Sequence, residues 1–128
     1  MQLLRQHHPA ELVVIGPAQD HEAARVLAEA GALNWTGAEM NLRRTFAVIA
    51  ESDFAIVTSS MAMHAAAAFA IPTVALLGEH FPSADAHARQ WGYAGQWCNL
   101  GKTSDHPGLT TPAEALAVIL PQLQRLGR

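Results

Sequence analysis

The stretch that decides the fold class is Phe54-Ala55-Ile56-Val57-Thr58-Ser59-Ser60-Met61-Ala62-Met63-His64-Ala65-Ala66-Ala67-Ala68. Its first four residues are continuously apolar, which is typical of a strand covered on both faces in a parallel sheet. Two serines follow, and either hydroxyl is a suitable N-cap for a helix. The helix after them has almost no polar side chain, so we expect it to be buried on all sides. A strand that enters a helix through so short a turn offers free backbone N–H groups to a phosphate.

Strands and helices alternate on both sides of this stretch. We expect strands at 12–15, 32–35, 54–57, 73–77 and 97–100, a helix ending near residue 8, further helices after residues 20, 41, 60 and 111, and a long polar loop at 79–96. This alternation predicts an α/β fold with a doubly wound, mostly parallel five-stranded sheet. In such folds ligands bind outside the carboxyl ends of the strands, where Gly16 and Gly78 follow two of the predicted strands.

Helical periodicity predicts which residues face the core. We expect Asp20 and Asn41 to cap two helices, because their side chains can accept hydrogen bonds from free helical N–H groups. The predicted buried stripes are Ala23, Val26, Leu27 and Ala30 in the first helix and Leu42, Phe46 and Ile49 in the second. The sequence Thr111-Pro112-Ala113-Glu114 is a capping box with proline at the first helical position, and it predicts the start of the last helix.

The composition is typical of a soluble globular domain. The chain has 128 residues, a net charge of −3, a single cysteine (Cys98) and 50% hydrophobic residues. A length of this order predicts one domain. The absence of a Lys/Arg cluster argues against nucleic acid as a partner, and a lone cysteine argues against a disulfide framework or a cysteine metal site. No apolar run is long enough to span a membrane and no secretory signal is recognisable, so we expect a cytoplasmic protein without cofactor or metal.

Four blocks of residues come in an order and at a spacing that resemble a known family. They are Gly16 after a buried strand, Asn41-Leu42 at a helix start, the block 59–67 around Met63-His64, and Ile71-Pro72-Thr73-Val74-Ala75-Leu76-Leu77-Gly78. Over about residues 8–85 the chain resembles the C-terminal, donor-binding half of the lipopolysaccharide heptosyltransferase family of glycosyltransferases (family 9, GT-B fold). The resemblance implies a Rossmann-like half-domain that binds a nucleotide-diphosphate sugar, such as ADP-heptose, in lipopolysaccharide biosynthesis.

The same resemblance assigns the candidate site residues. Matched on Met63-His64, the family loop that holds the diphosphate and sugar falls on 59–61, the loop near the base falls on 39–42, and Gly78 matches the glycine after a strand. The resulting substrate-binding candidates are Gly16, Met40, Asn41, Ser59, Ser60, Met61, His64 and Gly78. The chain departs from the family at Ser59, where the family has Asp, and at Met61, where it has Gly.

Two family segments have no counterpart in this sequence. They are the N-terminal acceptor domain, which supplies a catalytic carboxylate, and the first strand of the donor half with its Lys/Arg-containing loop. We therefore expect residues 1–128 to form a single truncated donor-binding domain that is not catalytically complete alone, and we assign no catalytic residue. Without that central strand, we expect the strand order 2-1-3-4-5, in which 12–15 pairs directly with 54–57, or an edge filled by a second copy in a homodimer.

A plainer structural interpretation stays open for each candidate. Ser59 and Ser60 also suit a helix cap, His64 a packed histidine, and Met40 and Met61 gap-filling in the core. Trp35 at a strand end suits either the lining of a cleft or packing, and Arg43 and Arg44 suit either a phosphate contact or a solvated helix face. The polar group Glu79, His80, Asp85 and His87 lacks a metal-ligand spacing and suits a solvated loop. The alternative function is a dimerising or partner-docking interaction module derived from such a domain. An enzyme of another class is less well supported, because no P-loop, Gly-x-Gly-x-x-Gly or Gly-x-Ser-x-Gly motif is present.

Overall fold

The computed structural model describes residues 6–7, 9–37, 39–78, 82–93, 97–101 and 110–126. The five strands are β1 (Val13–Gly16), β2 (Leu33–Thr36), β3 (Ala55–Thr58), β4 (Thr73–Leu76) and β5 (Trp97–Leu100). The helices are the short 3-10 helix η1 (Ala18–Asp20), α2 (His21–Glu29), α3 (Leu42–Ala50), α4 (Met61–Ala68), α5 (Ala84–Trp91) and α6 (Pro112–Arg125). The α/β class and all five predicted strands are confirmed, each within about two residues of its expected ends. The helix expected before residue 9 lies mostly outside the described residues.

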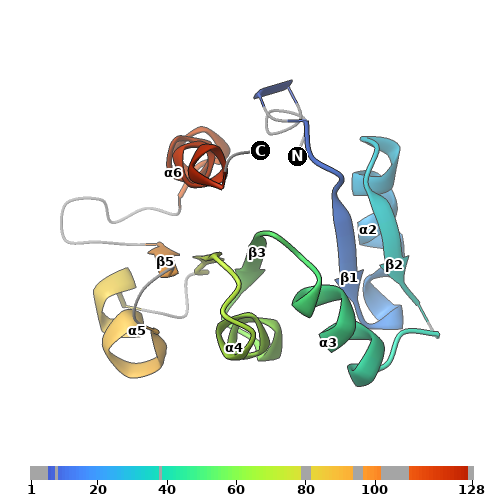
Figure 1. Cartoon of the computed structure of the whole chain (residues 1–128), viewed down its shortest axis with the longest axis horizontal. Coiled ribbons are helices and arrows are strands. Elements are labelled where there is room, and N and C mark those ends of the chain that lie inside the picture. Colours follow the sequence, from blue (N-terminus) through green and yellow to red (C-terminus); the bar gives the residue numbers. More distant parts are fainter. Residues whose placement is uncertain are drawn as a thin grey trace.

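The strands form two parallel sheets, and the prediction of one five-stranded sheet is wrong. β1 pairs with β2 in the register Val13↔Leu33, and β3–β4–β5 form the second sheet in the register Ala55↔Thr73 and Thr73↔Trp97. Figure 1 shows the β1–β2 pair standing apart from β3. The predicted order 2-1-3-4-5 therefore fails at its 1-3 step, because no described backbone hydrogen bond joins β1 to β3. Every observed pair joins two strands that are consecutive in the sequence. The predicted pair of β1 and β3 would instead join strands separated by α2, β2 and α3.

Helices cover both faces of the three-stranded sheet. On one face Val74 of β4 packs with Ile119 and Leu123 of α6. On the other face Ala75 packs with Met63 of α4 and with the residues around the start of α5. Figure 1 shows α6 on one side of β3–β5, with α4 and α5 on the opposite side. β4 is buried throughout its first three residues, as its apolar sequence predicts for a parallel strand covered twice.

The β1–β2 sheet connects to this core through two groups of apolar residues. Leu12, directly before β1, joins the cluster beneath α6, together with Phe54 directly before β3. Ile15 of β1 joins a second cluster built on Ile49 of α3 and Ala66 of α4. The segments that contain β1 and β3 therefore contact the same two clusters of apolar residues, although the strands lie in separate sheets.

Two of the predicted helix starts are confirmed in atomic detail. The Asn41 side chain accepts from the backbone N–H of Arg44 at 3.0 Å. Thr111 accepts from the Glu114 N–H at 3.3 Å while the Glu114 carboxylate accepts from the Thr111 N–H at 2.7 Å, so the capping box is complete. Asp20 occupies the N-cap position of α2, but its side chain makes no cap hydrogen bond.

The structure corrects one predicted loop and three predicted helix faces. Residues 84–91 of the expected 79–96 loop form α5, which Ser83 caps by accepting from the Ala86 N–H at 3.0 Å. In α2 the buried residue is Ala24, whereas Val26 is exposed, and in α3 Leu42 is exposed. The helix α4 is not buried on all sides, because Met61 and His64 reach the surface. Which side of a helix is buried depends on the elements that pack against it. Helical periodicity in the sequence does not identify those elements.

Candidate functional site

The structure divides the predicted site residues between the strand ends of two separate sheets. Gly16 and Thr36 end β1 and β2, Ser59 and Ser60 follow β3, and Gly78 follows the end of β4 by two residues. Because the strands within each sheet are parallel, their carboxyl ends share an edge, which is where open α/β sheets bind ligands. Met40 and Asn41 lie at the start of α3, directly after β2.

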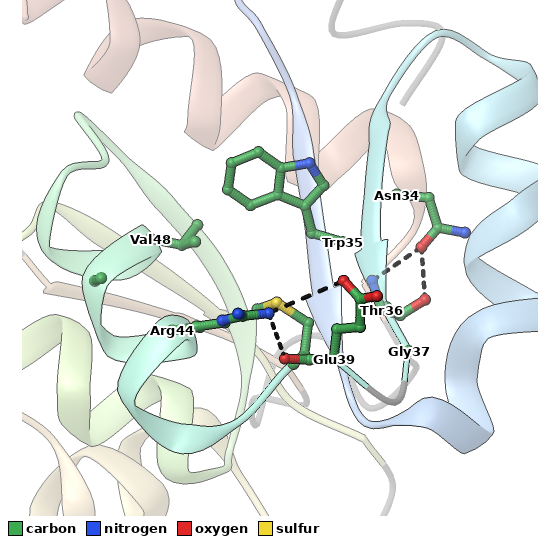
Figure 2. Close-up of a pocket in the computed structure, with 9 residues that line it drawn as sticks. Asn34, Trp35, Thr36, Gly37, Glu39, Arg44 and Val48 are labelled. Carbon is green, nitrogen blue, oxygen red and sulfur yellow. Dashed lines mark hydrogen bonds and ion pairs between the residues drawn. The ribbon is translucent and has the colours of Figure 1, made fainter.

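A pocket of about 510 Å³ opens beside the end of β2. Its lining residues come from β2, the turn after it and the adjoining face of α3, and they are Asn34, Trp35, Thr36, Gly37, Glu39, Met40, Arg44, Ala47 and Val48. Figure 2 shows the Trp35 indole extending from β2 toward Val48 of α3, with Arg44 closing the lower side. The volume falls within the range of roughly 300–1,000 Å³ that small-molecule sites occupy. Trp35, which lines this pocket, is 47% exposed.

Arg44 is held at this pocket by the turn before α3. Its guanidinium donates to the Glu39 backbone carbonyl at 2.8 Å and lies 4.0 Å from the Glu39 carboxylate. The Asn41 cap fixes the backbone N–H of the same residue. Arg43, the preceding residue, is exposed and does not line the pocket. The two arginines therefore differ in position: Arg44 lines the pocket and Arg43 does not.

The end of β2 is fixed by a network of polar side chains. His21, the first residue of α2, lies with its Nδ1 2.7 Å from the Thr36 carbonyl oxygen and 3.0 Å from the Thr36 hydroxyl. The Asn34 side-chain oxygen accepts from the Thr36 N–H at 3.1 Å and from its hydroxyl at 2.5 Å. Buried polar groups need such partners, so the network holds the pocket's rear wall in one conformation. Sequence reasoning missed His21, because its partner lies 15 residues away and no local pattern announces the pairing.

The two candidate glycines have different surroundings. A Cβ on Gly16 would lie 3.2 Å from the Asp20 carboxylate and 3.4 Å from the Thr36 methyl group. Glycine at this position therefore lets the end of β1 approach η1 and β2 closely. A Cβ on Gly78 would meet no atom of the described residues within 4 Å.

Ser59 and Ser60 point to different partners. The Ser59 hydroxyl lies 2.9 Å from Nε2 of His87, which is a buried residue of α5. Ser60 occupies the N-cap position of α4 without capping it, and its exposed hydroxyl instead donates to the Thr58 carbonyl at 3.4 Å. His87 is 1% exposed, so the expectation that it lies in a solvated loop is wrong. Glu79 and His80, from the same expected group, lie outside the described residues.

His64 belongs to an aromatic group on the outer side of α4. Its Nδ1 lies 2.5 Å from the Tyr93 hydroxyl, and its ring meets the edges of Trp91 and Tyr93 with centroids 6.1 and 5.8 Å apart. Met61, one turn before His64, is also exposed. His64 therefore has partners from the end of α5, whereas the pocket at β2 is lined by β2 and α3.

The described residues contain neither a metal-binding cluster nor a membrane-spanning helix. Among the described residues, no three His, Cys, Asp or Glu side chains come together as a metal site. None of the described helices combines the length and apolar character that crossing a membrane requires. Comparisons with protein-family models, curated proteins and solved structures find no match to this chain.

Proposed function

We propose that this chain binds a nucleotide-diphosphate sugar, as the Rossmann-like donor-binding domain of a heptosyltransferase-like glycosyltransferase of the GT-B fold. The observation that carries the proposal is the pocket beside Met40, which combines an exposed indole with a guanidinium at the carboxyl end of a parallel strand. The family resemblance independently assigns Met40 and Asn41 to the loop near the base. Lipopolysaccharide assembly in the cytoplasm is the biological setting that this resemblance favours, and ADP-heptose is the first sugar nucleotide to test.

Each side chain of the pocket suits one part of such a ligand. The Trp35 indole offers a flat face, and stacking of a base on an aromatic ring contributes about 1–3 kcal/mol. Ala47 and Val48 supply an apolar wall for the face of the base that the Trp35 indole does not cover. The Arg44 guanidinium suits a diphosphate, since charge-assisted hydrogen bonds to phosphate are stronger than neutral ones. In this proposal Ser60 and the start of α4 lie on the sugar side of the ligand.

Ligand titration with two matched pairs of variants tests the proposal. Thermal melting and tryptophan fluorescence are recorded with ADP, UDP, GDP and ADP-heptose at millimolar concentration. Binding at 100 times Kd stabilises the folded state by about 2.7 kcal/mol, which is a readily measured rise in melting temperature. Unchanged melting and fluorescence with all four compounds would contradict the proposal.

The paired variants locate the bound ligand. We expect Arg44→Ala to weaken binding by roughly ten- to a hundred-fold, the equivalent of one hydrogen bond to a charged group, while Arg43→Ala leaves it unchanged. Trp35→Phe removes the ligand-induced fluorescence change, whereas Trp91→Phe retains it. Trp91 is a fair control because its indole is 46% exposed, nearly the same as Trp35, but lies outside the pocket. Equal effects within either pair would place the ligand elsewhere.

A further inference from the structure

A serine and a histidine from distant parts of the chain form a close pair at the carboxyl end of β3. The Ser59 hydroxyl oxygen lies 2.9 Å from Nε2 of His87, and 28 residues separate the two in the sequence. A serine hydroxyl within hydrogen-bond reach of an imidazole nitrogen has the geometry of a nucleophile beside its general base. Such pairs are identified by geometry and not by sequence order, so no local motif marks this one.

Ser59 lies in the turn that joins a parallel strand to a helix. It directly follows β3, and α4 begins two residues later at Met61. The serine nucleophile of α/β hydrolases stands in a turn of the same kind, where its hydroxyl is exposed beyond the end of the sheet. Ser59 is half-buried and its neighbours Thr58 and Ser60 are exposed, so the turn is accessible to a substrate.

The helix α5 holds His87 in place. Ser83 caps this helix, and the His87 N–H donates to the Ser83 carbonyl at 3.1 Å. Ala84 and His87 form the buried side of α5, and His87 is 1% exposed, so its ring has little freedom to move away from Ser59. In the tautomer that carries its proton on Nδ1, His87 accepts from the Ser59 hydroxyl through Nε2, which is the atom that takes up a proton from a nucleophile.

Three backbone N–H groups follow Ser59 directly. Among the described residues, no hydrogen-bond acceptor meets the N–H groups of Ser60, Met61 and Ala62. The next N–H along the chain, that of Met63, donates to the Ser60 carbonyl at 3.1 Å. Backbone N–H groups next to a nucleophile stabilise the negative oxygen that forms when the nucleophile attacks a carbonyl group. The turn therefore combines a nucleophile, a base and hydrogen-bond donors for an oxyanion.

We propose that Ser59 and His87 form a catalytic pair that hydrolyses carboxylic esters of small acyl groups. Ser59 Oγ bonds to the ester carbonyl carbon while its proton passes to Nε2 of His87, and the N–H groups of Ser60 and Met61 donate to the oxyanion. The bond from this carbon to the alcohol oxygen then breaks, and that oxygen takes the proton from His87. Water attacks the acyl-serine with the same proton transfers, which releases the carboxylic acid and restores Ser59.

The residues around Ser59 suit a small and neutral substrate. Residues 54–78, which contain β3, α4 and β4, include no Asp, Glu, Lys or Arg that could pair with a charged substrate. A neutral ester acquires its negative charge only during the reaction, at the oxygen that the N–H groups meet. Met61 is 43% exposed and offers an apolar contact to a short acyl group. This site is separate from the nucleotide-sugar pocket, which β2 and α3 line.

Covalent labelling of the whole chain tests the nucleophile without any substitution. The probe is an alkyl fluorophosphonate, which forms a bond to an activated serine oxygen and releases fluoride, and mass spectrometry of the digested chain locates the adduct. We expect Ser59 to react at least about 100-fold faster than Ser52, because general-base assistance contributes at least that factor. Ser52 is a fair control, since it is also half-buried and its hydroxyl donates to the Val48 carbonyl at 2.7 Å. Equal rates at the two serines, or no adduct on Ser59, would overturn the proposal.

Hydrolysis of p-nitrophenyl acetate by single variants tests the pair. Ser59→Ala removes the nucleophile, and we expect its rate to fall to that of buffer. His87→Gln keeps a polar side chain but removes the base, so we expect kcat/KM to fall by roughly 100- to 10,000-fold. Ser52→Ala should keep the original rate. Circular dichroism checks that each variant is folded.

The outcomes distinguish catalysis from a purely structural hydrogen bond. A structural pair leaves Ser59 unreactive toward the fluorophosphonate, and folded Ser59→Ala and His87→Gln variants then hydrolyse the ester as fast as the original chain. Either result would refute the catalytic pair. If the variants do not fold, the position of the adduct on the original chain decides. No nucleotide is present in these assays, so their failure leaves the nucleotide-sugar proposal unaffected.

Discussion

Replacement of Ser59 by alanine tests whether this residue supports the fold from the edge of the candidate site. The Ser59 hydroxyl lies 2.9 Å from Nε2 of His87, and His87 is buried. Removing a hydrogen-bond partner from a buried polar group costs about 1–3 kcal/mol. We take about 2 kcal/mol as the central expectation, which lowers the melting temperature of a domain of this size by roughly 8 °C.

The adjacent serine provides the matched control. Ser60 is exposed, and its hydroxyl makes one long hydrogen bond of 3.4 Å to the Thr58 carbonyl. Ser60→Ala should therefore change stability by no more than about 0.5 kcal/mol. Urea unfolding of the original chain and of both variants, followed by circular dichroism, measures the two differences under identical conditions.

A double variant isolates the pair from other effects of each change. Each single variant already breaks the hydrogen bond between Ser59 and His87, so Ser59→Ala combined with His87→Leu should cost less than the sum of the single variants. Additive costs, or equal destabilisation by Ser59→Ala and Ser60→Ala, would refute the structural role of the Ser59–His87 pair. Ser59 would then be left with the ligand contact that the sequence resemblance predicts for it.

Two further predictions concern packing and capping. A Cβ on Gly92 would lie 2.5 Å from the Ala88 carbonyl oxygen, so Gly92→Ala should destabilise the chain by more than about 2 kcal/mol in urea unfolding. A Cβ on Gly78 would meet no described atom within 4 Å, so Gly78→Ala should be near neutral in the same assay. Equal midpoints for the two alanine variants would contradict this difference. Thr111→Ala removes the N-cap of α6 and should cost about 1 kcal/mol in the same assay. A loss below about 0.3 kcal/mol would show that the Glu114 half of the capping box suffices.

Local sequence signals predicted the elements of this fold well. The strand at 73–76 has three apolar residues after Thr73, and its first three residues are buried. The caps at Asn41 and Thr111 form as their spacing predicts. These features depend on residues within one turn or one strand, so their physical cause is present in a short window of sequence. The helix α5 was missed because its polar composition resembles a loop, although its alanines and the Ser83 cap favour a helix.

Features that depend on contacts between distant residues were not predictable in the same way. The split of the sheet arises because β1 meets the rest of the fold through Leu12 and Ile15, without backbone pairing to β3. The contact between Ser59 and His87 spans 28 residues, and nothing near either residue indicates it. Of the candidate site, the sequence predicted the turn at Met40, while the pocket itself depends on how α3 packs beside β2.

The two sheets differ in burial, and this difference indicates where stability resides. Thr73, Val74 and Ala75 of β4 are fully buried, whereas Leu33 and Trp35 of β2 are exposed. Amide exchange through local opening is governed by such differences, so the amides of β2 should exchange faster than those of β4. The pocket at Trp35 belongs to the less buried sheet. A ligand bound in this pocket should therefore slow exchange in β1 and β2 much more than in β4, and uniform protection across both sheets would contradict this division of the fold.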